Sequence, residues 1–113
     1  MLTIKKLEGN FSEMNRQKLL NLIGLSLRAG KMISGEELTL RDVRNQKAKL
    51  VFVAKNASEN TKKKMTDKCA FYHVPYNLDF TQEEISQAIG RNRMIVGICD
   101  EGFAKKMQEL SVE

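Results

Sequence analysis

The segment from Arg28 to Arg41 carries the residues whose types and spacing best suit the binding of a polyanion. In this segment Gly30 and Gly35 flank a short apolar stretch, and Gly35 directly precedes a predicted helix. Glycine adopts positive φ at no steric cost and lets another backbone approach closely. The N-terminus of a helix presents unpaired N–H groups that suit phosphate oxygens. The alternative is a plain turn into a helix with solvated charges, and the residue types alone favour that alternative.

Charged and polar side chains surround this predicted turn. Arg41 lies one helical turn beyond Glu37, so the two side chains can share one helix face. The guanidinium of an arginine can bind the O6 and N7 edge of guanine through two hydrogen bonds. The candidate nucleic-acid-binding residues of this segment are therefore Arg28, Lys31, Ser34, Gly35, Glu36, Glu37, Thr39 and Arg41.

A second basic turn, Arg91-Asn92-Arg93, directly follows Gly90. Its two arginines bracket a tight loop, which favours a binding role over a purely structural one. If this loop lies beside the loop at Gly35, the two loops form one positive surface. We therefore add Arg91, Asn92 and Arg93 to the candidate RNA-binding residues.

A lysine run, with Lys62, Lys63, Lys64 and nearby Lys68, falls in a predicted helix. A solvated helix face is the favoured interpretation, with RNA contact by Lys62 and Lys63 kept as the functional alternative. Aromatic residues make up only 6% of the chain and there is no Trp, so stacking platforms for single strands are not indicated. This composition favours structured RNA over open single strands.

Composition places the chain among soluble globular proteins. It has 113 residues, 42% of them hydrophobic and 29% charged, which fits one domain. We assign that domain to residues 14–113 and treat residues 1–13, which show no clear period, as an N-terminal extension. No apolar run approaches the roughly 20 residues of a membrane span, and the N-terminus lacks a signal core, so we expect no membrane association and no secretion.

Charge and cysteine content bear on partners and compartment. Nineteen basic residues oppose fourteen acidic ones, giving a formal net charge of +5 and a pI near 9.3, which points to a nucleic-acid partner. Cys69 and Cys99 are too few for a disulfide framework and each falls in an apolar run, so we expect buried, reduced thiols and a cytoplasmic protein.

Residues for catalysis or cofactor binding are scarce. The single histidine, His73, has no sequence hint of a triad partner, and we interpret it as partly buried and structural. The acidic pairs Glu36-Glu37 and Glu83-Glu84 each start a predicted helix, where they offset the helix dipole. There is no metal-binding motif and no glycine-rich phosphate loop, so we expect no enzyme, no metal and no cofactor. Two alternatives stay open: a protein-interaction adaptor for an RNA-processing or translation machine, and a nucleotide-binding enzyme of Rossmann-like shape.

The periodicity predicts helices that alternate with short strands. Ser12, Ser58 and Thr81 are expected N-caps, and Ser34–Glu37 and Thr81–Glu84 have capping-box spacing. Helices are expected over 14–29, 35–46, 58–72, 81–89 and 101–110, and strands over 31–34, 48–54, 73–76 and 94–99. The apolar runs of the second and fourth strands indicate burial on both faces.

This alternation predicts an α/β domain with helices on both faces of the sheet. Ligands of such sheets bind at the loops beyond the strand ends. The loops of greatest interest are therefore those at 30–37 and 90–93.

The order GKMISGEELTLRDVRNQKAKLV, followed by AKNAS, resembles the kink-turn-binding ribosomal protein family of the L7Ae/L30e type, and within it the bacterial YlxQ group. The stretches NTKKKMTDKC and VPY add to the likeness, which spans roughly Met14 to Leu110. The resemblance implies a three-layer α-β-α sandwich around a small mixed four-stranded sheet. It also implies that the protein is associated with the ribosome or another ribonucleoprotein and that its partner is structured RNA. Binding to DNA or to a membrane is not expected.

The resemblance further implies roles for particular residues. In RNA-binding members, the turn matching Gly35 enters the major groove of a sharply bent RNA and contacts sheared G·A pairs, and Arg41 matches a lysine that contacts RNA. The loop matching Arg91–Arg93 covers an extruded nucleotide. Position 37 is Glu here, where strong kink-turn binders carry Asn or Lys, and Leu38 stands where several members have Glu. The resemblance therefore implies RNA binding more firmly than it implies the standard kink-turn target.

Overall fold

Five helices and four strands alternate along the chain in a computed structural model that describes residues 13–111. The predicted Ser12 cap and the extension, apart from Glu13 in the first helix, lie outside the described residues. The elements are α1 Glu13–Arg28, β1 Met32–Ser34, α2 Glu36–Arg44, β2 Leu50–Val53, α3 Glu59–Phe71, β3 Tyr76–Asn77, α4 Gln82–Ile89, β4 Ile95–Ile98 and α5 Glu101–Ser111.

The four strands form one mixed sheet in the order β1-β4-β2-β3. β4 pairs antiparallel with both β1 and β2, while β2 and β3 are parallel. Every residue of β2 and β4 is buried, as the uninterrupted apolar runs predicted.

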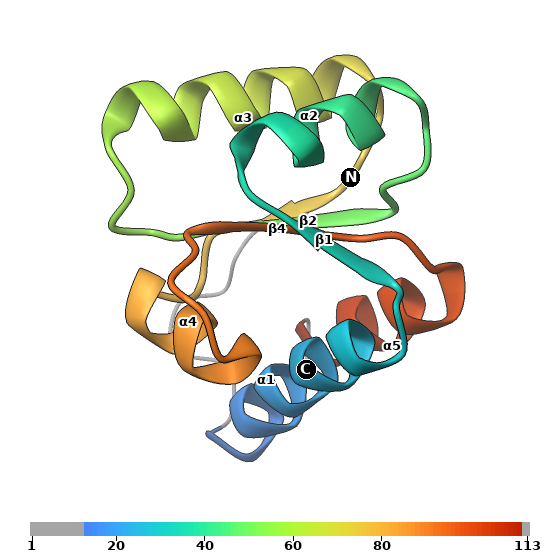
Figure 1. The fold of residues 1–113 in the computed structure, drawn as a ribbon, viewed down its shortest axis with the longest axis vertical. Helices are drawn as coiled ribbons and strands as arrows, with labels where there is room; N and C mark the ends of the chain where they lie inside the picture. The colour runs from blue at the N-terminus through green and yellow to red at the C-terminus, as the bar shows by residue number, and fades with distance from the viewer. Residues whose placement is uncertain (1–12, 112–113) are drawn as a thin grey trace.

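The sheet is the middle layer of three (Figure 1). Helices α2 and α3 cover one face, and α1, α4 and α5 cover the other. The close approach of α2 to the sheet depends on Gly97, because a Cβ at that position would lie 3.2 Å from Cγ2 of Thr39. The expected α-β-α sandwich around a mixed four-stranded sheet is confirmed.

The N-cap residues expected from the sequence are correct for α3 and α4 and wrong for α2. The Ser58 side chain accepts from the Thr61 N–H, and Thr81 and Glu84 form a complete capping box. The expected Ser34–Glu37 box does not form. Gly35 is the N-cap of α2 instead, and no side chain of the described residues caps that helix.

The third strand is shorter and later than predicted. It covers only Tyr76–Asn77, because the chain first turns sharply at His73, whose φ is +61°. The Val74 N–H donates to the Cys69 carbonyl, a bond that closes the C-terminus of α3. His73 is exposed at this turn, so its predicted partial burial is wrong.

An ion pair fixes α4 against α1. Nη2 of Arg16 lies 2.7 Å from Oε1 of Glu84, and the Arg16 guanidinium also stacks over the ring of Phe80. Burial of Glu84 opposes its ionisation, but hydrogen bonds from Arg16 and from the Thr81 backbone outweigh that effect and lower the pKa of this carboxyl. Because the residues before β4 follow α4 directly, the ion pair also helps to place the loop at 91–93.

Candidate nucleic-acid interface

The two loops predicted from the sequence meet at one end of the sheet, on the left of Figure 1, but the part of the first loop that lies there, Ser34 to Glu37, carries no cation, so the expected positive surface is limited to the second loop. Ser34 pairs with Val96 in the antiparallel register, and the Gly35 N–H donates to the Ile95 carbonyl at 2.9 Å. The end of β1 and the residues before β4 therefore lie side by side. Nε of Arg93 donates to Oγ of Ser34 at 3.1 Å, so a side-chain bond joins the two loops. We call residues 34–37, 55–56 and 91–93 the candidate edge.

The backbone of Gly35 sets the start of α2 at this edge. Its φ of 97° and ψ of 153° fall in a region that is essentially restricted to glycine. No other described atom lies within 4 Å of where a Cβ would stand, so the turn is open on that side. With no capping side chain, the first turn of α2 can offer its N–H groups to an acceptor outside the protein.

The acidic residues at the start of α2 differ in their pairing. Nζ of Lys64 on α3 lies 2.7 Å from Oε2 of Glu36, which offsets that negative charge. Glu37 is exposed in the same helical turn. One turn later, Nε of Arg41 lies 3.0 Å from Oδ1 of the buried Asp42, while 55% of the Arg41 side chain remains exposed. The Asp42 carboxylate thus orients the Arg41 guanidinium without burying it. Oδ2 of Asp42 also accepts from Sγ of Cys99, which follows β4, so Arg41 lies toward the opposite end of the sheet, outside the candidate edge.

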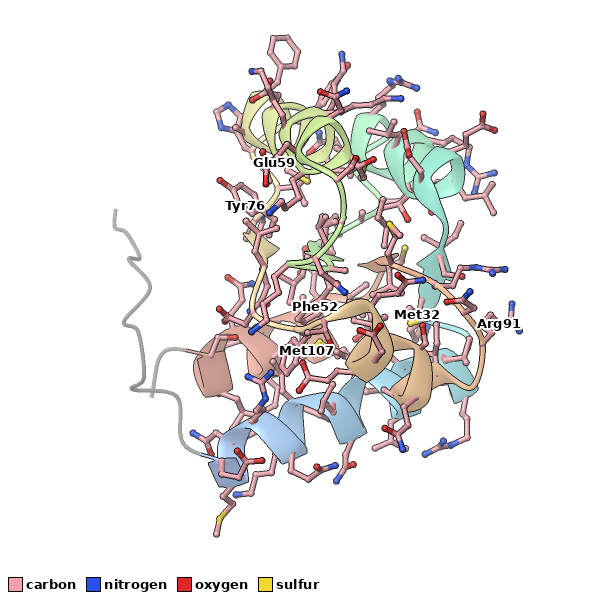
Figure 2. All side chains as sticks on the ribbon, turned by 90° about the vertical axis from the view of Figure 1, so that its left-hand side faces the viewer. Met32, Phe52, Glu59, Tyr76, Arg91 and Met107 are labelled. Carbon is pink, nitrogen blue, oxygen red and sulfur yellow. The ribbon has the colours of Figure 1, made fainter. Side chains whose placement is uncertain are left out.

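The loop before β4 presents its side chains to solvent. Arg91 and Asn92 are exposed and Arg93 is half-buried. Figure 2, which looks onto this end of the molecule, shows Arg91 at the outer boundary, beyond Met32. The sequence-predicted residues that the structure brings together at the candidate edge are Ser34, Gly35, Glu36, Glu37, Arg91, Asn92 and Arg93.

Thr39 is a correction to the predicted site. Its side chain is completely buried, with Cγ2 directed at Gly97 of the sheet, so it cannot contact RNA from this position. Its hydroxyl has no hydrogen-bond partner within residues 13–111. Thr39 belongs to the packing of α2 on β4, and we remove it from the candidate site.

Two other predicted cations lie away from the candidate edge. Lys31 precedes β1, where its carbonyl accepts from the Cys99 N–H, so it stands about 13 Å from Gly35 along an extended strand. Arg28 is the last residue of α1 and is exposed. Its guanidinium lines a polar groove of about 680 Å³ between α1 and α4.

The lysines of α3 are engaged in local pairs. Nζ of Lys62 donates to the Lys55 carbonyl at 3.0 Å, which places Lys62 next to the candidate edge. Lys63 pairs with Asp67 one turn along the helix, at 2.9 Å, and remains exposed. Such pairs weaken with salt and compete poorly with a polyanion, so both lysines stay candidates.

Lys55 and Asn56 are edge residues that sequence reasoning missed. Val53 at the end of β2 pairs with Ile95 at the start of β4, so the two residues that follow Ala54 reach the same edge. Both are exposed. The signal for them was their position in a polar loop directly after a buried strand, where ligands of α/β sheets bind.

Groups suited to catalysis do not gather in the described part of the chain. Within residues 13–111 no three His, Cys, Asp or Glu side chains lie close enough to hold a metal ion. Cys69 is buried as predicted, whereas Cys99 is only half-buried. Burial raises the pKa of both thiols to about 11, and the carboxylate of Asp42 adds to the effect at Cys99. None of the helices over this range has the length and apolar character needed to cross a membrane.

The chain belongs to the ribosomal protein L7Ae/L30e/S12e/Gadd45 family, whose model matches residues 17–108. This match confirms the resemblance found in the sequence.

Individual relatives agree with that assignment. The chain is 61% identical over 99 residues to the RNA-binding protein YlxQ of Enterococcus faecium, covering 88% of this chain and 96% of that protein. It is 44% identical over 90 residues to the RNA-binding protein YlxQ of Bacillus subtilis, covering 79% and 90%.

Solved structures share the fold. A protein described as of unknown function from Bacillus halodurans superimposes with a TM-score of 0.82 at 36% identity, over 85% of this chain and 98% of the other. The Giardia lamblia 15.5kD RNA binding protein superimposes with a TM-score of 0.74 over 96% and 94%, and at 18% identity this likeness concerns the fold alone.

Proposed function

We propose that this protein is a non-enzymatic, cytoplasmic RNA-binding protein that recognises structured, kink-turn-like RNA as part of the ribosome or another ribonucleoprotein. The observation that carries the proposal is the Arg93–Ser34 hydrogen bond, which joins the two predicted binding loops into one surface. The two relatives named RNA-binding protein YlxQ support it independently of the geometry.

The roles of the edge residues follow from their chemistry. The open first turn of α2 and the arginines of the 91–93 loop suit phosphate oxygens. Glu37 is exposed and can accept a hydrogen bond from guanine N–H groups or from cytosine N4. Arg41 lies outside the candidate edge; we assign it to a guanine of an RNA that extends along α2, with its two Nη groups as donors and Asp42 holding Nε.

A filter-binding titration at moderate salt tests the proposed target. The probe is an RNA duplex with an internal kink-turn and sheared G·A pairs, compared with a fully paired RNA duplex of equal length and with duplex DNA. We expect the kink-turn RNA to bind most tightly, because the edge recognises shape as well as charge. No affinity for any of the RNAs would contradict the proposal and would favour the protein-interaction adaptor.

Arg41→Ala tests the base contact assigned to this residue along α2. We expect it to weaken binding of the kink-turn RNA by about 1–3 kcal/mol. Arg44→Ala is the matched control, since it removes an equal charge from the exposed last turn of the same helix. Equal losses for the two variants in the same assay would remove Arg41 from the site and leave only non-specific electrostatics.

A further inference from the structure

The loop at 91–93 folds back onto the helix that precedes it. Gly90 ends α4 with a φ of 75°, and its N–H donates to the Ser86 carbonyl. The chain then returns, so that the Arg93 backbone lies against the Ser86 side chain. The Arg93 N–H donates to Oγ of Ser86 at 3.0 Å, and this hydroxyl donates to the Arg93 carbonyl at 3.0 Å. One side chain thus bonds both backbone polar groups of Arg93.

Gln82 gives the loop a second attachment. It lies one helical turn before Ser86, so both side chains are on the same face of α4. Nε2 of Gln82 donates to Oδ1 of Asn92 at 2.7 Å. The Gln82 backbone N–H is in turn bound by Oδ1 of Asn56 at 2.9 Å. A continuous series of hydrogen bonds therefore runs from the loop after β2, through α4, to the loop at 91–93.

That series continues across the candidate edge. Arg93, held by Ser86, donates through Nε to Ser34 directly before Gly35. In contrast, Arg91 and Asn92 are exposed and contribute no apolar side chain to the core. The conformation of the loop therefore depends on these polar attachments more than on packing. A loop without them would have to be ordered at the moment of binding, which costs affinity.

We propose that Ser86 and Gln82 are positioning residues of the RNA interface: they hold Asn92 and Arg93 in the binding conformation in the free protein. Neither residue needs to touch the RNA, because each acts through the loop. This inference rests on the proposed function, and it adds α4 to the elements on which RNA affinity depends.

Amide hydrogen exchange of the free protein tests the first half of the inference. Ser86→Ala removes the acceptor of the Arg93 N–H, so that amide is expected to exchange about tenfold faster or more. Gln87→Ala is the matched control, because it changes the exposed neighbouring residue of the same helix. Ser86→Thr keeps the hydroxyl and should restore slow exchange. Unchanged exchange in Ser86→Ala would overturn the inference.

RNA affinity tests the second half. With the kink-turn RNA as probe, Ser86→Ala and Gln82→Ala should each bind about threefold to tenfold more weakly, the value of one hydrogen bond. Gln87→Ala should bind as the original chain does. In a background in which Arg91, Asn92 and Arg93 are all alanine, Ser86→Ala should cause no further loss, because the loop side chains through which it acts are already gone. A full additional loss there would mean that Ser86 contacts the RNA itself, which would contradict the inference.

The two halves separate this inference from the proposed function. If the unchanged chain fails to bind the kink-turn RNA, the proposed function fails, and the RNA role of Ser86 fails with it. The exchange measurement still decides whether Ser86 orders the loop. If the unchanged chain binds well and Ser86→Ala loosens the loop without loss of affinity, the proposed function stands and the inference is wrong.

Discussion

The two ends of the sheet use positive φ for different purposes. At the candidate edge, Gly90 ends α4 in the same way as the turns at the other end, but Gly35 turns the chain from β1 into α2, and side chains from separate segments bond to one another, as in Ser34–Arg93. At the opposite end, Gly30, Gln46 and His73 end helices α1, α2 and α3 with φ of 73°, 62° and 61°. There the bonds mostly run within one helix end, such as the Lys31 N–H to the Ser26 carbonyl.

The candidate edge is therefore a surface assembled from several segments, whereas these turns at the opposite end each close the C-terminus of a single helix. The left-handed turns at the opposite end satisfy the last carbonyls of their helices and need no partner. The conformation of Gly35 does not close a helix end in this way, since α2 begins there with no side-chain hydrogen bond to its first N–H groups. In addition, α2 and α3 both direct their N-termini to the candidate edge, so their dipoles favour anions there (Figure 1), whereas α4 ends beside the edge and α5 begins at the opposite end.

The largest effect is expected from Gly35→Ala. The added methyl meets no described atom within 4 Å, so the penalty comes from the backbone angles alone. We expect the free energy of unfolding to fall by about 1–3 kcal/mol. RNA affinity should also fall about tenfold or more, because relaxation of the turn displaces the first turn of α2 from the bases. Urea unfolding and filter binding measure the two effects.

Gly30→Ala is the matched control for that comparison. Gly30 also has positive φ and open space around it, but it lies at the opposite end of β1. It should cost about 1 kcal/mol of stability and leave the RNA affinity of the folded protein unchanged. If Gly30→Ala weakened RNA binding as much as Gly35→Ala, the contrast between the two ends would be lost.

A smaller effect is expected from Lys64→Met. This variant leaves the Glu36 carboxylate unpaired at the candidate edge, where it would repel phosphates. We expect RNA affinity to fall about twofold to fivefold, as exposed ion pairs are weak and screened by salt. Lys106→Met removes the same charge from an exposed position of α5, on the other face of the sheet, and should change affinity less than about twofold. Titrations at two salt concentrations compare the variants, and an equal loss for both would mean that only the net charge matters.

Local signals accounted for most of the fold and for part of the site. The Thr81–Glu84 box and the apolar runs at 48–54 and 94–99 were predictable because each depends on residues close in sequence. The Ser34–Glu37 box was predicted by the same rule and fails because the Ser34 hydroxyl bonds Arg93, 59 positions away. Contacts between residues so far apart in the sequence follow from strand register, which the spacing of residues along the chain does not predict.

The same limit explains the contacts and the strand bounds that the sequence did not predict. Lys64 and Glu36 are 28 positions apart and meet only because α2 and α3 share one face of the sheet. β3 has two residues and exists through its pairing with β2, so it has no pattern of its own. Thr39 fits a binding motif by position but faces the sheet, which only the packing of α2 on Gly97 reveals.

The smallest effect, and the one with opposite sign, is expected from His73→Gly. A side chain at a φ of +61° lowers the stability of the folded state by about 1–2 kcal/mol. Glycine removes this strain, but the greater conformational entropy of its unfolded chain offsets part of the gain. We expect a net gain of about 0.5–1 kcal/mol in the free energy of unfolding, measured by urea denaturation at constant m value. His73→Ala removes the imidazole but keeps the strain, so it should give no such gain. RNA affinity should stay constant in both variants, because this turn lies at the opposite end of the sheet from the candidate edge. A change in affinity would mean that the two ends do not act independently.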